Sequence, residues 1–350
     1  MSQRLYAAVL AGVLLFALVV AASLLPLPYV TYSPGITVNV LGKQDGEPIV
    51  QVEGHRSFRD DGQLRMTTVY VTQPGGRVTL LDAMEAWLSD EKAVYPYDAL
   101  YGPDETAEDS RTESAVQMVS SQDAATAVAL RELGYRATPV VEVLDVTEGM
   151  PAEGRLKVRD VITRVGTTDV RTPQDVVDAL QGAPAGEPVE FGIQRDGKPM
   201  TVEITPTTVD GHPRVGVVPG PGYDFPFDVT VNIDPNIGGP SAGLMFSLGI
   251  YDTLTPGSLT DGQTVAGTGT IDPTGKVGPI GGIQQKVVAA RDAGAKLFLV
   301  PADNCQDALG APRGDMELVR VDTMHSALTS VQRWAEDPGA SLPSCTAGAA

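Results

Sequence analysis

The N-terminal segment of the chain is a long, uncharged and mostly apolar run. No charged residue occurs between Leu5 and Gly42, and Tyr6–Leu25 is a run of 20 mostly apolar residues. A helix rises about 1.5 Å per residue, so this run is long enough to cross the roughly 30 Å hydrocarbon core of a bilayer. We therefore predict an N-terminal transmembrane helix. A cleaved signal peptide, with Val20-Ala21-Ala22 at the cleavage site, is the alternative.

The positive charges around this helix predict its orientation. Arg4 precedes the apolar run, and the next positive charge is Lys43. By the positive-inside rule the N-terminus is cytoplasmic, so a single span holds an extracytoplasmic body at the cell membrane. A disulfide bond between Cys305 and Cys345 is permitted in such a compartment, and two unpaired thiols are the alternative.

Composition limits the class of protein further. The chain has 350 residues and is 42% hydrophobic, which is enough for two domains besides the membrane helix. With 25 basic and 44 acidic residues its net charge is −19, which excludes nucleic acid as a partner because phosphates are bound by basic surfaces. The cysteines form no Cys-x-x-Cys pair and lie near no histidine, so we predict no metal and no cofactor. Mixed helix and strand patterns indicate an α+β body.

Short patterned segments follow the membrane helix. Leu64–Thr72 alternates like a strand, and 113–133 has helical periodicity that ends at Gly134. We expect an acidic, exposed loop over 103–110. The other expected elements are strands over 37–41 and 49–52 and a helix over 79–88.

Residues 137–206 form a separate module in which strands and turns alternate. Its helix begins at Thr172, since threonine is a good N-cap and the following Pro173 fits the first turn. The pair Asp196-Gly197 is typical of a hairpin turn. The expected strands are 139–146, 160–165, 189–194 and 200–205.

This module resembles a PDZ domain of the bacterial protease type. The resemblance rests on three segments, which are Gly149-Met150-Pro151-Ala152, Leu156-Lys157-Val158-Arg159-Asp160-Val161-Ile162 and Arg195-Asp196-Gly197-Lys198. Arg159 stands where that pattern usually has glycine. The resemblance implies that peptide ends bind by strand addition. It also implies a carboxylate-binding loop at Gly134, Tyr135, Arg136 and Ala137. A merely structural insert is the alternative.

A serine between small residues marks a candidate nucleophile. Gly239-Pro240-Ser241-Ala242-Gly243 follows a β-like run and opens the uncharged segment 244–251, so Ser241 lies at a strand-to-helix turn. The positive end of the following helix could stabilise an oxyanion. Lys286 follows 45 residues later with no histidine between, which indicates a Ser–Lys hydrolase. Ser241 as a helix cap is the bland alternative. A Ser–His–Asp triad is disfavoured because His325 alone follows Ser241 and lacks a strand-end context.

The position of Lys286 on a helix fits a general base. If 283–294 is helical, Ile283, Val287 and Ala290 fall on one apolar arc, and Lys286 lies at its edge. Partial desolvation would lower the pKa of the lysine, as a base acting near neutral pH requires. A lysine that snorkels into water is the alternative.

Residues 208–337 resemble the proteolytic domain of Lon. The matching segments are Gly239–Gly243, Gly267-Thr268-Gly269-Thr270-Ile271, Gly275-Lys276-Val277, Pro279–Ile283 with Lys286, Ala290 with Ala293-Gly294-Ala295, and Leu299–Asn304. The resemblance implies Ser241 as nucleophile, Lys286 as general base and Thr268 as a supporting hydroxyl. The oxyanion would be held by backbone N–H groups around Gly239 to Ala242. Thr270 replaces a glutamate common in ATP-dependent members, so that role does not transfer. Lon-type domains often form rings, so a homo-oligomer is expected by resemblance.

The sequence carries no nucleotide loop to drive unfolding. The segment from Gly269 to Lys276 is one residue too long for a Walker A motif, and Val277 replaces its Ser or Thr. We therefore expect an ATP-independent serine endopeptidase that acts on peptides or unfolded proteins. A non-catalytic or latent PDZ peptide-binding adaptor on a Lon-like scaffold is the alternative. The chain resembles membrane-anchored, PDZ-containing Lon-like serine proteases, and this resemblance implies a split proteolytic domain (28–136 and 207–338) with the PDZ domain (137–206) inserted. The other expected parts are the anchor (1–27) and a tail (339–350).

Overall fold

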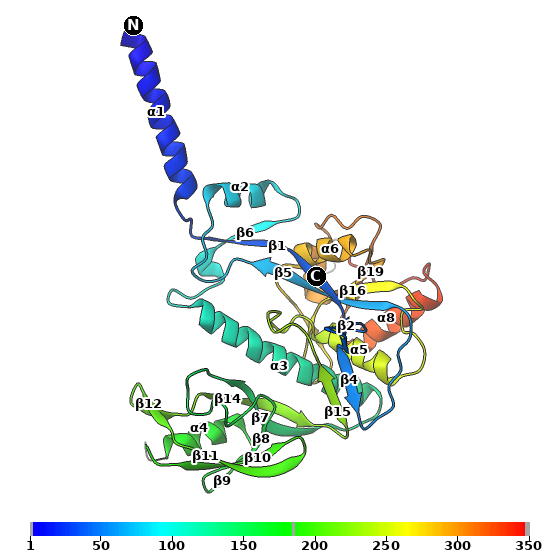
Figure 1. The fold of residues 1–350 in the computed structure, drawn as a ribbon. Coiled ribbons are helices and arrows are strands. Elements are labelled where there is room, and N and C mark those ends of the chain that lie inside the picture. The colour runs from blue at the N-terminus through cyan, green and yellow to red at the C-terminus, as the bar shows by residue number, and fades with distance from the viewer. Residues whose placement is uncertain (1–2, 184–185, 347–350) are drawn as a thin grey trace.

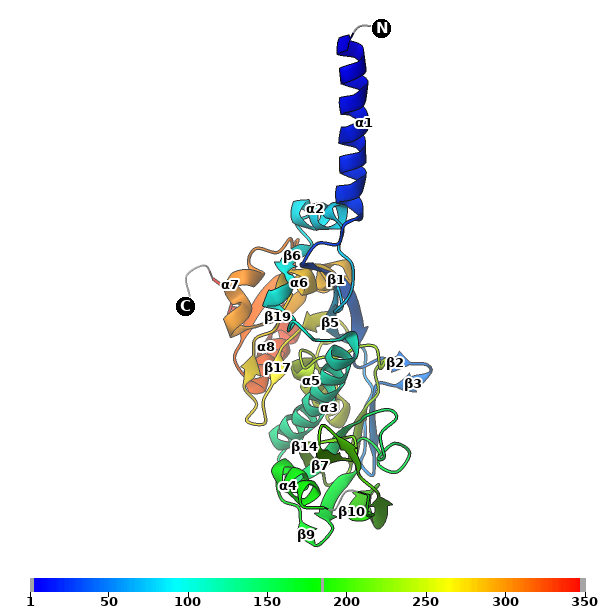
Figure 2. The same cartoon turned by 90° about the vertical axis from the view of Figure 1, so that its left-hand side faces the viewer.

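The computed structural model describes residues 3–183 and 186–346, so the last four residues of the predicted tail lie outside the described part. A long N-terminal helix stands away from the body, and a sheet-containing unit lies at the opposite end (Figures 1 and 2). The helices are α1 (Gln3–Leu24), α2 (Leu80–Leu88), α3 (Ala107–Glu132), α4 (Pro173–Gln181), α5 (Gly243–Leu254), α6 (Ile283–Asp292), α7 (Cys305–Ala308) and α8 (Met324–Glu336).

The main sheet has six strands in the order β20-β19-β16-β5-β1-β6. The strands are β20 (Glu317–Val321), β19 (Leu297–Pro301), β16 (Thr264–Gly267), β5 (Gln63–Val71), β1 (Tyr29–Asn39) and β6 (Ala93–Pro96). Pairing is parallel from β20 to β5 and antiparallel from β5 to β6. Leu64 on β5 pairs with Val265 on β16, so segments far apart in the sequence form the centre of the sheet.

Helices cover both faces of this sheet, as the apolar run of β19 requires. Leu297 and Leu299 pack in the core on the α5 face. Phe298 and Val300 pack in a second core with α6. Parallel strands buried on both faces are continuously apolar, which explains why β19 shows no alternation of apolar and polar residues.

The second sheet forms the unit at the far end of the body. Its antiparallel strands are β11 (Lys198–Ile204), β10 (Val189–Arg195), β8 (Val161–Val165), β7 (Thr138–Val146) and β14 (Val217–Asp224), in that order, with β9 (Thr168–Asp169) beside β8. It has its own core, which includes Phe191 and Val215. The sheet therefore continues to Asp224, beyond residue 206. The domain boundaries stay predictions.

Four short strand pairs complete the fold. They are β2 (Lys43–Gln44) with β3 (Glu47–Pro48), β4 (Val50–Glu53) with β15 (Asp228–Val231), β12 (Thr207–Val209) with β13 (His212–Arg214), and β17 (Thr270–Ile271) with β18 (Val277–Gly278).

Two elements begin earlier than the sequence predicted. The structure has helix over 107–110, so the loop expected over 103–110 is wrong there. Thr106 and Asp109 form a capping box, in which each side chain accepts a hydrogen bond from the other residue's backbone N–H. β1 begins at Tyr29 rather than at 37, because its first residues pair with β6. The strand predicted over 64–72 and the helix predicted over 79–88 agree with β5 and α2 within a residue or so.

α1 and α3 are the two longest helices of the described chain. The window Gln3–Val20 of α1 is wholly exposed and has a mean hydropathy of 2.0, so by length and composition α1 could cross a membrane or act as a signal sequence. α3 packs on α5 and also contacts β7 and β14 of the second sheet. α3 therefore joins the two units.

Candidate active site

Three segments bring the predicted catalytic side chains to the carboxyl end of β16. Thr268 directly follows β16, Ser241 lies two residues before α5, and Lys286 is in the first turn of α6. α5 and α6 cover opposite faces of the sheet, so their first turns meet only beyond its strand ends. Such strand-end crevices are the usual place for ligands in α/β sheets.

The lysine and the serine are in direct contact. Lys286 Nζ lies 2.7 Å from Ser241 Oγ and 3.2 Å from Thr268 Oγ1. Thr268 Oγ1 donates a hydrogen bond to the Ser241 carbonyl oxygen at 2.9 Å, which leaves its own lone pairs for the lysine. The hydroxyl of Thr268 thus holds both partners.

Lys286 does not snorkel into water. It is only 2% exposed, and this burial lowers the pKa of its ammonium from the usual 10.5 to about 7. Taking a lysine out of water disfavours its charged form. A large share of these lysines is therefore neutral near pH 7, as a general base must be.

The start of α6 requires glycine at position 282. Gly282 has φ of 66°, the left-handed region, and its carbonyl accepts from the Lys286 N–H at 3.0 Å. A Cβ there would lie 2.8 Å from the Val69 side chain and 3.1 Å from that of Tyr32. α6 can therefore start close to the sheet, which directs Lys286 inward.

α3 holds the loop that carries Ser241. The Gly239 N–H donates to the Ser114 carbonyl oxygen at 2.9 Å, and Ser121 Oγ donates to the Pro240 carbonyl oxygen at 3.0 Å. Gly239 and Pro240 therefore offer no free N–H, contrary to their expected part in holding an oxyanion. In the described part of the chain the N–H groups of Ser241 and Ala242 donate to no other residue.

Two further predicted features lie away from the serine. His325 is on α8 with its side chain 73% exposed, and it pairs with Glu132 at 2.6 Å, so it contributes nothing to Ser241. Cys305 and Cys345 form a disulfide bond, which ties the tail to α7.

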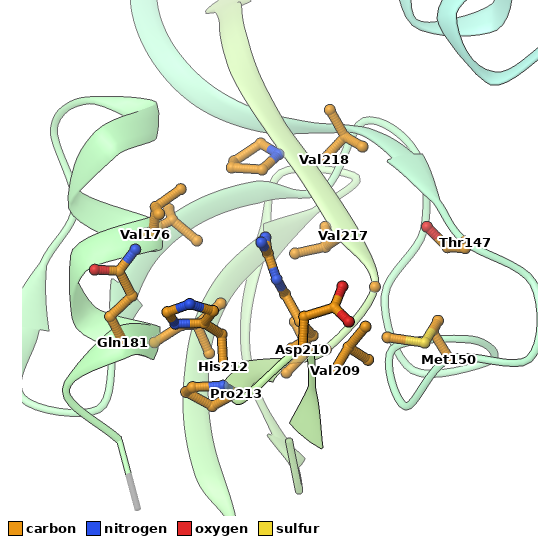
Figure 3. A pocket seen from close by; sticks show the side chains of 16 residues that line it. Thr147, Met150, Val176, Gln181, Val209, Asp210, His212, Pro213, Val217 and Val218 are labelled. Carbon is orange, nitrogen blue, oxygen red and sulfur yellow. The ribbon is translucent and has the colours of Figure 1, made fainter. Parts of the chain in front are cut away.

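A cavity of about 470 Å³ lies in the second unit, between α4 and the loop that leads into β14. Figure 3 shows Val176 and Gln181 of α4 beside Val217 and Val218 of β14 at this cavity. Among the residues that the structure describes, β14 is the edge strand of its sheet, so no strand pairs with its outer backbone groups.

The predicted carboxylate-binding residues do not line this cavity. Gly134, Tyr135, Arg136 and Ala137 connect α3 to β7, and the Tyr135 hydroxyl bonds to His55 Nε2 at 2.9 Å. The missed signal is a glycine inside an apolar run, Val215-Gly216-Val217-Val218. Gly216 has φ of 78°, and a Cβ there would lie 2.1 Å from Met150 Cβ, so only glycine fits.

A cluster of buried charges joins the second unit to α3. Arg159, at φ of 74°, pairs with Asp123 and donates to Gln122 Oε1 at 2.9 Å. Glu142 on β7 is 4% exposed and lies beside Asp123. Burial and the Asp123 charge raise the pKa of Glu142 to about 9, although Arg159 acts in the opposite sense. The arginine that replaces the usual glycine therefore adds an ion pair to the contacts between α3 and the second sheet.

Comparisons with known proteins agree with this division. Residues 235–332 match the profile of the Lon protease (S16) C-terminal proteolytic domain, and residues 115–205 match the profile of the PDZ domain. The chain therefore contains a Lon-type proteolytic domain, which carries Ser241 and Lys286, together with a PDZ domain.

Each of the curated relatives matches only part of this chain. Lon protease of Campylobacter concisus is 36% identical over 110 residues, which are 30% of this chain and 13% of that protein. Lon protease 2 of Bacillus subtilis is 35% identical over 107 residues, which are 30% of this chain and 19% of that protein. The chain thus spans a small part of the length of these curated relatives. The PDZ domain of an SdrC-like protein from Listeria innocua is 27% identical and covers 23% of this chain and 92% of its own, with a TM-score of 0.22.

Proposed function

We propose that the chain is a membrane-anchored, ATP-independent serine endopeptidase in which Ser241 is the nucleophile and Lys286 the general base. The 2.7 Å contact between a buried lysine and Ser241 Oγ carries this proposal. Burial keeps much of the lysine neutral near pH 7. An unprotonated amine in contact with a serine hydroxyl is the arrangement that activates a nucleophile without histidine.

The reaction proceeds in two halves. Neutral Lys286 takes the Ser241 proton as Oγ bonds to the scissile carbonyl carbon, whose π electrons move to oxygen. The tetrahedral intermediate then expels the amine, which takes the proton from the Lys286 ammonium, and an acyl-enzyme remains. Water then attacks the acyl carbon while its proton goes to Lys286. The second tetrahedral intermediate expels Ser241 Oγ, which takes that proton back from the Lys286 ammonium as the new carboxyl end leaves.

The developing oxyanion is stabilised by the N–H groups of Ser241 and Ala242. Both precede α5, whose N-terminal end carries partial positive charge. Donors that are already oriented are worth several kcal/mol in such sites. Thr268 acts as a positioning residue, because its hydroxyl contacts the lysine and the serine carbonyl.

The N-terminal helix and the disulfide bond support an extracytoplasmic location in this proposal. α1 spans the membrane with Arg4 on the cytoplasmic side, so the body faces outward. The Cys305–Cys345 bond fits an oxidising compartment, since disulfides persist outside the reducing cytoplasm. A ring-shaped homo-oligomer stays a prediction.

A serine-directed fluorophosphonate probe with intact-mass readout tests the nucleophile. We expect the wild-type chain to gain one adduct, mapped to Ser241, and the Ser241→Ala variant to gain none. Ser247→Ala is the matched control, because Ser247 is buried on α5 and donates to the Leu244 carbonyl. A folded chain that no probe labels, even at alkaline pH with peptide present, contradicts the proposal and favours the peptide-binding adaptor.

The PDZ domain supplies peptide capture. A peptide end would lie along the free edge of β14 and place side chains in the cavity beside α4. Val177 lines this cavity and is half-buried. We expect Val177→Asp to weaken the binding of a dye-labelled decapeptide with an apolar carboxyl end by about tenfold or more, since a charge would be buried against the peptide.

Fluorescence polarisation measures this affinity. Val158→Asp is the matched control, because Val158 is 43% exposed and lies outside the cavity. Equal affinities for the two variants would place the peptide elsewhere.

A further inference from the structure

α2 presents its apolar side to the outside. Leu81, Met84, Trp87 and Leu88 are 63%, 46%, 79% and 72% exposed. At 100° per residue these four side chains fall within one arc of the helix. A surface helix of a water-soluble protein normally packs such an arc on the core, so α2 is oriented the opposite way.

The rest of α2 explains this orientation. Ala86 is 2% exposed, so the helix packs on the body through its small side chains. The charged side chains are held nearby: Asp82 closes a capping box with Thr79, and Glu85 pairs with Lys92. With Ala86 packed inward, the apolar arc faces away from the body.

α2 lies where α1 leaves the body. The two helices contact each other, and the Leu27 N–H donates to the Val78 carbonyl oxygen at 2.8 Å, just before α2. Figures 1 and 2 both show α2 beside the body-proximal end of α1. If α1 crosses a bilayer, α2 stands at the level of the headgroups.

We propose that α2 is a membrane-surface helix that inserts Leu81, Met84, Trp87 and Leu88 into the outer-leaflet interface. The inference rests on the proposed membrane anchoring by α1. Amphipathic helices with tryptophan on the apolar face bind at this depth, where the indole ring is favoured. The chain has a net charge of −19 and α2 itself carries Asp82 and Glu85, so we expect the contact to be apolar and to depend little on salt.

The surface helix would give the anchored protein a fixed tilt. α1 alone is a single pivot, whereas α1 and α2 together are two points of attachment. The PDZ domain lies at the end of the molecule remote from α1 (Figures 1 and 2), so it would be held away from the lipid.

The two tryptophans of the chain provide the test. Trp87 is 79% exposed on α2, and Trp334 on α8 is 4% exposed. The full chain is reconstituted in phosphatidylcholine vesicles whose acyl chains carry bromine near the headgroup. In Trp334→Phe, which reports on Trp87, we expect emission to fall at least twofold relative to unbrominated vesicles. In Trp87→Phe, which reports on Trp334, we expect no change.

Flotation of the vesicles separates the two proposals. A chain that fails to float with the vesicles overturns the anchoring itself. A chain that floats, but whose Trp87 is quenched by aqueous iodide and not by bromolipid, overturns the surface helix alone. Protection from both quenchers also overturns it, because another protein or a second copy then covers the arc. If Trp334→Phe misfolds, the difference between wild type and Trp87→Phe gives the Trp87 signal.

Discussion

Replacing Lys286 with methionine should abolish peptide hydrolysis and at the same time stabilise the fold. The activity should fall by about three orders of magnitude or more, because a general base with no substitute nearby is removed. Methionine keeps the length of the side chain but has no charge to bury. Lys286 is only 2% exposed, so the charged form is strongly disfavoured in the native state.

The size and the pH window of the stability gain follow from the pKa. Lys286 has a pKa of about 7 in the fold and 10.5 when unfolded, so below pH 7 the native protein must bury a charged ammonium. At about 1.4 kcal/mol per pKa unit this costs on the order of 5 kcal/mol. Between pH 7 and 10.5 the unfolded state binds more protons, so wild-type stability rises with pH. The advantage of Lys286→Met is therefore full below pH 7 and shrinks above it.

Denaturant unfolding at several pH values measures the gain, and hydrolysis of a quenched-fluorescence peptide measures the loss. In the wild type, kcat/KM should rise with pH through about 7 and then level off, because the neutral lysine is the active form. Lys276→Met is the matched control, since Lys276 is exposed in the same domain and should change neither quantity. Hydrolysis that survives in Lys286→Met with its pH profile intact would assign the base to another group.

Replacing Arg159 with methionine should destabilise the junction between the PDZ domain and α3. The substitution leaves Asp123, which is 2% exposed, as a buried carboxylate without its cation. Because the Arg159 side chain is 36% exposed, we expect a loss of roughly 1 to 3 kcal/mol, less than for a fully buried pair. The loss should be smaller in the double variant with Asp123→Asn, because the uncompensated charge is then absent.

Glu142, the second buried carboxyl at this junction, makes the stability of the fold depend on pH. The pKa of Glu142 is raised to about 9 by burial and by Asp123, with Arg159 opposing and the Tyr223 hydroxyl also near Asp123. A raised carboxyl pKa means that the native state holds a proton that the unfolded state loses above about 4.5. Stability from this group therefore falls as pH rises from 4.5 to 9. Glu142→Gln should flatten that slope.

Thermal unfolding from pH 5 to 9 reads out both effects. Arg155→Met is the control for Arg159→Met, because Arg155 is exposed in the same domain. An Arg159→Met chain as stable as wild type would mean that water, rather than the arginine, compensates Asp123.

The candidate active site could be predicted from the sequence better than the cavity beside α4 could. Ser241 and Lys286 lie in compact motifs whose neighbours, small residues and an apolar helical arc, constrain them locally. The burial of the Lys286 head could not be predicted, since it depends on Gly282 packing against β1 and β5. The cavity beside α4 was not predicted, because β14 lies after residues 137–206 in the sequence and yet pairs with β7, the first strand of that module. Arg159 looked like a departure from a turn pattern, and only the fold shows that its side chain reaches α3.

The pairing of β5 with β16 joins two segments that are far apart in the sequence, so we expect it to form late in folding. β5 is synthesised before the PDZ domain, and its parallel neighbour β16 only after it. The strands of the PDZ sheet all lie between Thr138 and Asp224, so that domain can close while β5 still waits for its partner. Contacts between such distant segments form late. Ser241 and Lys286 meet only once β16 and α6 are in place, so we expect a chain that is still being synthesised to have no assembled dyad.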